Sequence, residues 1–440
     1  MCHVNVLRYF HTIEQMKHFH SSPPNRREIK LLHYIVFHVL KHMNDQTIHF
    51  IYCSIILVLI IILLIYKHME TEHHPSLSGA YLNYSSTNAR RNGTLNPSDL
   101  AYPQTMENRG EFLTFAIELK KRVNAQADAR VIINSGATES IAQCIFWAKN
   151  YNQFGVVQGT EFDHSAVKDN CDNFDIPYDN ESLRKNKILD NCSMIFLTQV
   201  NSRNGEILDI ANFKRNIIDK YNYLHSMSGG GKSVAPDAKH VRQYKPLVVL
   251  DATQSITKVP IDMERWGIDA VFFSLHKIGG PIGAGLLILY DGTNTFKPLI
   301  AGKQQDKFRG GTFPLEAVLS SIRFMNETDD LNVRKARWQT AFDKLTGAGL
   351  TVYKPTGKHL YNTLLINVNR CPLALINALA EQNIYVGNVS ACANEVEQKA
   401  LKGGEKKKYA PFERAIRISF LKPDELSDSA LAEIIRVVKD

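Results

Sequence analysis

The chain has 440 residues, of which 44% are apolar and 22% charged, and its formal net charge is +8. The composition is that of a folded protein, and the length excludes a single compact core and predicts about two domains and a tail. Much of the basic excess lies in the tail and in loops such as residues 402–408, which indicates solvated charge rather than a nucleic-acid site.

The seven cysteines are scattered along the chain, odd in number and free of CxxC pairs. This pattern argues against a disulfide framework and favours a reducing compartment. The sequence has no ligand spacing typical of zinc or of another metal, so we expect no metal site.

Residues 1–75 differ from the rest of the chain. They contain the apolar run IHFIYCSIILVLIIILLIY at residues 48–66, which has no Asp, Glu, Lys or Arg. This run has the length of a helix that crosses a bilayer and lies too far from the start for an ordinary secretory signal. It predicts a single transmembrane helix as a membrane anchor, with a buried core helix as the alternative.

The sequence does not determine on which side of the membrane the large part of the chain would lie. Basic residues before the run would keep the first segment cytoplasmic and send the large remainder across, which conflicts with its free thiols. If translation starts at Met69 instead, the anchor is absent and a cytoplasmic protein is expected.

After the tail, apolar strands alternate with helices, which predicts a mostly parallel sheet covered on both faces. The expected strands in this part are residues 80–87, 130–134, 154–158 and 194–200, the last followed by Asn201. Apolar residues at helical spacing predict helices at residues 111–124 and 141–147.

Residues 135–140, SGATES, separate the strand at 130–134 from the helix at 141–147. Hydroxyl groups and backbone amides at a helix start suit a phosphate, and simple capping explains the same residues equally well. His164 follows the next strand, and a lone histidine in such a place is usually structural.

The polar insertion at residues 224–245 contains SGGGKS, whose ending is typical of nucleotide-binding loops. That motif needs a glycine five residues before Gly231, where the chain has Ser226, and no strand leads into it. We interpret this segment as a flexible loop.

Residues 248–289 carry the strongest chemical signal in the chain. Two apolar strands, VVLDA and AVFFSL, precede a third apolar run, GAGLLILY. Asp251 ends the first strand, and Lys277 follows the second, with Gly279 and Gly280 behind it. An acid and a lysine at the carboxyl ends of neighbouring parallel strands, beside glycines that permit close backbone approach, describe a ligand crevice.

Pyridoxal 5'-phosphate (PLP) accounts for this combination. It needs a lysine for a Schiff base, an acid beside its ring nitrogen, and phosphate donors at loop or helix ends. The alternative is a surface lysine near an ordinary buried aspartate.

The last third of the chain predicts a smaller α+β unit. Helices are expected at residues 338–345, 373–382 and 430–438, and strands at residues 364–368 and 384–386.

Several short segments, taken together, point to one family. The chain has YLNYSST at residues 81–87, SGATES at 135–140, EFDHSAV at 161–167 and DATQS at 251–255. It continues with SLHK at 274–277, RGGT at 309–312, SAC at 390–392 and IRIS at 416–419. In order and at family-like spacing, these segments resemble the motifs of NifS/IscS-type cysteine desulfurases, PLP-dependent members of the class V aminotransferase family.

The resemblance implies a role for each matching residue. Lys277 would form the Schiff base and move protons, and Asp251 would pair with the ring nitrogen. His164 would stack on the ring and transfer protons, and Arg417 would bind the substrate carboxylate. The implied cofactor-binding residues are Ala137, Thr138, His164, Asn201, Asp251, Gln254, Ser274, His276, Lys277 and Thr312.

Within that set, Thr138, Ser274 and His276 would hold the phosphate, and Gln254 would bond the ring hydroxyl's oxygen. Thr312 would reach the phosphate of a second subunit, which implies a homodimer.

Cys392 is the residue that would select the reaction. Small neighbours indicate a mobile loop, and about 25 residues separate it from Arg417. By the resemblance, its thiolate attacks the sulfur of bound L-cysteine, leaving alanine and a persulfide. A small buried cysteine is the alternative.

The chain departs from the family pattern in its opening segment, where Asn83, Ser85 and Ser86 replace Asp and two Ala, in the insertion near Gly229, and in two further segments. VNSRNG at residues 200–205 stands for VNNE-x-G, and AGKQQ at 301–305 stands for GGGQE. These changes indicate a divergent member, and they leave three other interpretations open: a selenocysteine lyase or cysteine-sulfinate-type relative, a class V aminotransferase, and an inactive membrane-tethered scaffold.

The sequence therefore predicts an α/β protein of PLP-dependent transferase fold type I. We expect a tail at residues 1–75, a large PLP-binding domain at 76–330, and a small domain at 331–440 that carries the Cys392 loop and Arg417. The expected reaction converts L-cysteine to L-alanine and passes the sulfur to an unidentified protein acceptor, without nucleic acid.

Overall fold

The computed structural model describes residues 80–82, 106–220, 245–326, 330–389, 414–420 and 422–440. The chain divides into two units, Met1–Pro75 and Ser76–Asp440, and all the described residues belong to the second. The predicted tail with its apolar run at residues 48–66, the SGGGKS loop and Cys392 lie outside the described residues. Among the described residues, no helix has both the length and the apolar character needed to span a membrane, so the anchor stays a prediction.

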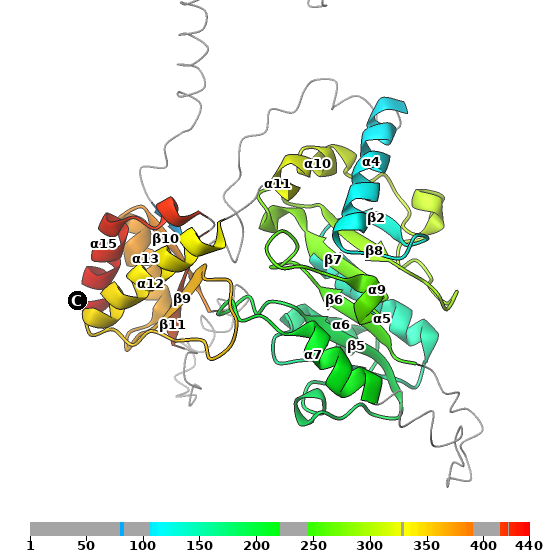
Figure 1. The fold of residues 1–440 in the computed structure, drawn as a ribbon, viewed down its shortest axis with the longest axis horizontal. Helices are drawn as coiled ribbons and strands as arrows, with labels where there is room; N and C mark the ends of the chain where they lie inside the picture. Colours follow the sequence, from blue (N-terminus) through cyan, green and yellow to red (C-terminus); the bar gives the residue numbers. More distant parts are fainter. Residues whose placement is uncertain (1–79, 83–105, 221–244, 327–329, 390–413, 421) are drawn as a thin grey trace, which may run out of the picture. The chain divides into compact units, whose positions relative to one another are not determined.

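A seven-stranded sheet has the order β2-β8-β7-β6-β5-β3-β4 (Figure 1). Its strands are β2 (Arg130–Asn134), β3 (Val156–Gln158), β4 (Tyr178–Asp179), β5 (Cys192–Thr198), β6 (Leu247–Asp251), β7 (Ala270–Ser274) and β8 (Gly285–Leu289). The adjacent strands β7, β6, β5, β3 and β4 run parallel to one another. Strand β8 runs antiparallel to both of its neighbours, β2 and β7. The predicted mostly parallel sheet is confirmed.

Helices cover both faces of this sheet because its strands are apolar on both sides. In β6, Val248 and Leu250 join one core cluster with residues of α4, α7 and α9, and Leu247 and Val249 join another with α5 and α6. Successive side chains of a strand point to opposite faces, so one continuous apolar run serves two cores.

The helical segments of this part vary in length from a single turn to nearly five turns. They are α4 (Met106–Arg122), α5 (Ala137–Tyr151), α6 (Ser165–Asn173), η3 (Leu183–Lys185), α7 (Ile210–Phe213), η4 (Lys214–Ile218), α9 (Met263–Trp266), η5 (Leu275–Lys277), η6 (Gln305–Lys307), α10 (Leu315–Leu319) and α11 (Ile322–Met325).

A second sheet of four strands has the order β1-β10-β11-β9, with β1 parallel to β10 and the remaining pairs antiparallel. Its strands are β1 (Ala80–Leu82), β9 (Thr363–Asn367), β10 (Ile384–Asn388) and β11 (Ala415–Ser419). The accompanying helical segments are α12 (Leu331–Gly347), α13 (Pro372–Glu381), η7 (Pro423–Glu425) and α15 (Asp428–Lys439). Helices α12, α13 and α15 share one core cluster with the sheet, as expected for the α+β part. The predicted boundary at residue 330 stays a prediction.

Helix α5 begins earlier than expected, at Ala137 rather than at residue 141, because the polar SGATES segment itself forms its first turn. The turn approaches the sheet closely. A Cβ atom on Gly285 of β8 would lie 2.5 Å from the Cα atom of Gly136, so glycine permits this contact. The close approach brings the start of α5 to the ends of β7 and β8.

Candidate functional site

A cavity of about 270 Å³ is built around the carboxyl ends of β5, β6 and β7. Asp251 ends β6 and is in register with Phe272 of the parallel strand β7, which ends at Ser274. Nine of the predicted site residues line this cavity: Ala137, Thr138, His164, Asp251, Gln254, Ser274, His276, Lys277 and Arg417. The expected crevice at the ends of neighbouring parallel strands is therefore present.

Three other predicted residues are not in this lining. Asn201 is buried, and its side-chain oxygen accepts a hydrogen bond from the backbone amide of Arg203 at 2.9 Å. Thr312 is exposed, and its role toward a second subunit stays a prediction. Cys392 lies outside the described residues, although Val389, three positions earlier in the sequence, lines the cavity.

The start of α5 supplies the phosphate-type donors of the cavity. The backbone amide of Ala137 donates to the Ser274 hydroxyl at 2.7 Å, and no side chain caps the helix. Backbone amides and the positive end of the helix dipole favour an anion at such a terminus. With Thr138 and His276 in the same lining, the donor set fits a phosphate group.

Asp251 supplies a buried carboxylate at the sheet end of the cavity. Its side chain is 6% exposed, and its Oδ1 accepts a hydrogen bond from the Thr253 amide at 2.8 Å. Burial raises the pKa of Asp251, while the Thr253 bond and the nearby His164 and Lys277 oppose that rise. A buried carboxylate in this position suits a cationic ring N–H, which would replace the missing solvation.

His276 and Lys277 lie together on the short helix η5, directly after β7. Burial, together with the charge of Lys277, lowers the pKa of His276 to about 4. The imidazole is therefore neutral near pH 7 and still carries one N–H that is able to donate to an oxyanion.

His164 is the N-cap residue of α6, and its Nδ1 accepts a hydrogen bond from the amide of Ala166 at 3.2 Å. That bond places the proton of the neutral ring on Nε2. Burial lowers the pKa of His164; Lys277 and Arg203 lower it further, and Asp251 acts in the opposite sense. The cap thus fixes the ring position, and the surroundings favour its neutral form.

Asp163 also lines the cavity, and sequence reasoning gave it no role. Its carboxylate accepts from the Thr160 amide at 2.9 Å, from the hydroxyls of Thr160 and Thr198 at 2.9 and 2.8 Å, and from Tyr178 at 3.1 Å. Burial raises its pKa to about 7 against these donors. The sequence could have indicated Asp163 only as an acid directly before His164 after a strand. Its hydrogen-bond partners come from three separate segments, which the sequence does not bring together.

Arg417 connects the second sheet with the loop after β5. This residue of β11 is 2% exposed, and its Nη1 donates to the carbonyl oxygens of Ser202 at 3.0 Å and Val389 at 3.3 Å. Its guanidinium lies in the cavity lining, where it suits a carboxylate. Arg203 of the same loop also lines the cavity, and the sequence had signalled it only as a departure from VNNE-x-G.

These features together fit PLP. The α5 terminus with Ser274 offers anion donors, Asp251 lines a cavity that also contains an amine, and His164 provides an aromatic ring at its wall. Each group has a counterpart in the phosphate, ring nitrogen, aldehyde and ring face of the cofactor.

Comparison with protein families identifies the family of the chain. The model of the Aminotransferase class-V family matches residues 117–425, and the chain belongs to this family. The predicted NifS/IscS-like relationship is confirmed by the relatives that follow.

Two curated relatives illustrate the degree of similarity. The chain is 28% identical over 205 residues to the cysteine desulfurase IscS of Buchnera aphidicola, covering 44% of this chain and 46% of that protein. It is 26% identical over 245 residues to the cysteine desulfurase IscS of Photorhabdus laumondii, covering 52% and 54%. The chain thus spans about half the length of the relatives it matches.

Solved structures share the fold. A NifS-like protein matches with a TM-score of 0.65 and 19% identity, over 82% of this chain and 99% of that one. The structure of SspA in complex with cysteine matches with a TM-score of 0.58 and 18% identity, over 78% and 98%. Both support the predicted fold type, which is confirmed.

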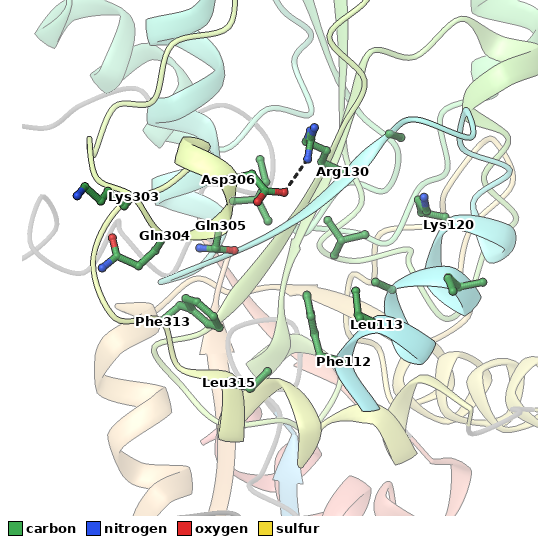
Figure 2. A pocket seen from close by; sticks show the side chains of 15 residues that line it. Phe112, Leu113, Lys120, Arg130, Lys303, Gln304, Gln305, Asp306, Phe313 and Leu315 are labelled. Atoms are coloured by element: carbon green, nitrogen blue, oxygen red, sulfur yellow. Dashed lines mark hydrogen bonds and ion pairs between the residues drawn. The ribbon is translucent and has the colours of Figure 1, made fainter. Parts of the chain in front are cut away.

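A larger cavity, of about 670 Å³, lies elsewhere, between α4, β2 and residues 303–315 (Figure 2). The side-chain amide of Gln305 bonds both the amide and the carbonyl of Ile133, at 2.7 and 2.8 Å, and Arg130 pairs with Asp306 at 2.9 Å. None of the predicted cofactor residues lines it. We therefore assign the chemistry to the smaller cavity, where the titratable groups converge.

Proposed function

We propose that this chain is a PLP-dependent cysteine desulfurase that converts L-cysteine to L-alanine and retains the sulfur on Cys392. The observation that carries the proposal is the position of Asp251 and Lys277, which end or follow two adjacent parallel strands and line one cavity. An acid for the ring nitrogen and an amine for the aldehyde are the two groups that PLP chemistry requires.

When bound, PLP withdraws electrons from the Cα of an amino acid. Around it, the Asp251 carboxylate would keep the ring nitrogen protonated, and the Lys277 amine would hold the aldehyde carbon and then move a proton at the substrate Cα. His164, with its proton on Nε2, would pack on the ring and donate to or accept from the substrate.

Arg417 would position the substrate. Its nearly complete burial and the bond from its Nη1 to the Ser202 carbonyl restrict the guanidinium to one orientation. A fixed guanidinium binds a carboxylate through two parallel hydrogen bonds, which orients the Cα substituents.

Cys392 would take the substrate sulfur as a persulfide, because a thiolate is a strong nucleophile toward sulfur. Its closeness in sequence to Val389, a lining residue, supports this role. A persulfide requires a further thiol to receive the sulfur, so we propose a protein acceptor, together with a homodimer in which Thr312 serves the neighbouring site. Membrane attachment through residues 48–66 is part of the proposal for the full chain.

The decisive experiment measures sulfide and alanine released from L-cysteine by the full chain loaded with PLP. We expect equal amounts of both in the presence of a thiol reductant and loss of both in Cys392→Ala. Cys371→Ala is the matched control, since Cys371 lies outside the cavity, and it should keep full activity. Formation of the corresponding keto acid from L-cysteine that persists in Cys392→Ala would favour a class V aminotransferase instead.

A further inference from the structure

A side chain completes the hydrogen bonding of β2 on the side away from β8. Strand β2 ends the order of the seven-stranded sheet and pairs with β8. The buried Ile133 of this strand donates its amide N–H to Oε1 of Gln305 at 2.7 Å, and its carbonyl accepts from Nε2 of Gln305 at 2.8 Å (Figure 2). The side-chain amide thus takes the place of a peptide group on a further strand.

The loop that carries Gln305, residues 300–310, is closed at its base and is here called the edge loop. The amide of Gly310 donates to the carbonyl of Ile300 at 2.7 Å, and a Cβ atom on Gly310 would collide with the backbone across the base. Within the edge loop, residues 305–307 have φ values of 47°, 55° and 70°. L-residues disfavour this left-handed region, so three in a row persist only where their contacts enforce the conformation.

The edge loop makes a second attachment near the first. Arg309 forms an ion pair with Glu139, which belongs to the first turn of α5. Gln305 holds the chain before the turn that joins β2 to α5, and Arg309 holds it after that turn. The edge loop therefore fixes both ends of one short segment.

That segment contains the anion donors of the cofactor cavity. Ala137, whose amide begins the donor set, follows Ile133 by four residues. Between them, Asn134 accepts from the amide of Gly136 at 3.0 Å and donates to the hydroxyl of Ser140 at 2.7 Å. Because these bonds leave the turn little freedom, the position of the Ile133 peptide groups sets the position of the α5 terminus.

Glutamine is the residue type that suits position 305. A primary amide offers one donor group and one acceptor, which match the carbonyl and the N–H of Ile133. A glutamate would accept from the same N–H, but its second oxygen would face the Ile133 carbonyl oxygen. Two acceptors in contact repel each other, so this exchange would displace the edge of β2 with almost no change in side-chain size.

We propose that Gln305 is a positioning residue for the phosphate group of the cofactor. It lies outside the lining of the cofactor cavity and acts through the edge of β2, which holds the start of α5 in a geometry that binds phosphate. This inference rests on the proposed function and adds to it a residue that governs cofactor affinity from the neighbouring cavity.

The test compares PLP with pyridoxal, which has the same ring and aldehyde and lacks the phosphate, by fluorescence titration of the full chain. The ratio of the two affinities isolates the contribution of the phosphate. In Gln305→Glu we expect the affinity for PLP to fall about tenfold and that for pyridoxal to stay within about twofold. Gln305→Met, which removes both bonds without adding charge, should lower the ratio in the same direction.

Gln304→Glu is the matched control, since it adds the same charge one residue earlier. Gln304 uses only its Oε1, which accepts from the amide of Gly311 at 3.0 Å, and a glutamate retains that acceptor. The ratio should therefore stay unchanged. A second readout is the 31P chemical shift of bound PLP, which should move in Gln305→Glu and remain in place in Gln304→Glu.

The inference stands if the ratio falls in either Gln305 variant while it stays constant in Gln304→Glu, and it is overturned otherwise. Equal loss of both ligands, through unfolding or not, would make Gln305 a general stabilising residue. Either contrary result, with PLP bound and L-cysteine converted by the native chain, leaves the proposed function intact. Failure of the native chain to bind PLP would overturn both.

Discussion

The carboxylate of Glu139 receives two hydrogen bonds from the guanidinium of Arg309, Nε to Oε1 at 2.8 Å and Nη2 to Oε2 at 3.2 Å. The two side chains are only 12% and 15% exposed. This pair ties the first turn of α5, which belongs to the cavity wall, to the loop that continues to Thr312. The same carboxylate also accepts from the amide of Ser135 at 2.8 Å.

Arg309→Met is expected to lower the free energy of unfolding by about 3 kcal/mol, because it leaves the Glu139 charge largely buried without its partner. The double variant Glu139→Gln, Arg309→Met should recover part of that loss. Urea unfolding of the native chain and the two variants measures both effects. A single variant as stable as the native chain would contradict the assigned contribution of this pair.

The same pair gives a pH dependence. Burial on its own raises the pKa of Glu139, but the bonds from Arg309 and Ser135 outweigh it, so the net pKa lies below the ordinary value. The stabilisation is therefore present above that ordinary value and is lost as pH falls through the lowered one. Unfolding measured at a series of acidic pH values should show a flatter stability curve once the pair is removed.

Ser274→Ala should weaken PLP binding about tenfold, since the hydroxyl bonds the α5 terminus and is placed to bind phosphate. Ser193→Ala is a matched control: Ser193 is also buried and hydrogen-bonded, to the carbonyl of Val156 at 3.1 Å, but is outside the cavity lining. Both variants should lose some stability, but only Ser274→Ala should lose affinity for PLP, which fluorescence titration measures. Equal cofactor affinity in the two variants would argue against the phosphate role of Ser274.

Asp163→Asn should change how stability depends on pH. The folded carboxyl keeps its proton up to a pKa of about 7, whereas its ordinary value is 3.8. Between these values the folded state binds more protons than the unfolded state, so the stability contribution falls as pH rises, by up to about 1.4 kcal/mol per pH unit.

The side-chain amide that this substitution introduces does not titrate, so the variant should lose that slope. Unfolding measured for both proteins at a series of pH values across the window gives the difference directly. Parallel curves, separated by a constant offset, would show that Asp163 is already ionised throughout.

The sequence predicted the parts of the fold that depend on local pattern. Strand β2 begins and ends at the expected residues, and Asp251 and Lys277 are at neighbouring strand ends, because buried parallel strands are continuous apolar runs. The start of α5 was predicted four residues late, since its polar first turn has no apolar spacing to reveal it.

Other features of the site depend on contacts between distant segments, which no local pattern encodes. The four donors to Asp163 come from the loop after β3, from β4 and from β5, so the hydrogen-bond partners appear only once the sheet is assembled. Arg203 was visible as a sequence departure, but its place in the cavity wall with Arg417 required the fold.

The central claim is that the Lys277 amine holds PLP, and borohydride reduction of the PLP-loaded chain followed by peptide mass spectrometry tests it most directly. Reduction fixes the cofactor on the lysine that carries it. We predict a pyridoxyl-phosphate label on the peptide that contains Lys277, its loss in Lys277→Ala, and its retention in Lys185→Ala, which alters an exposed lysine outside the cavity. A label on another lysine, or no retained cofactor, would contradict the account.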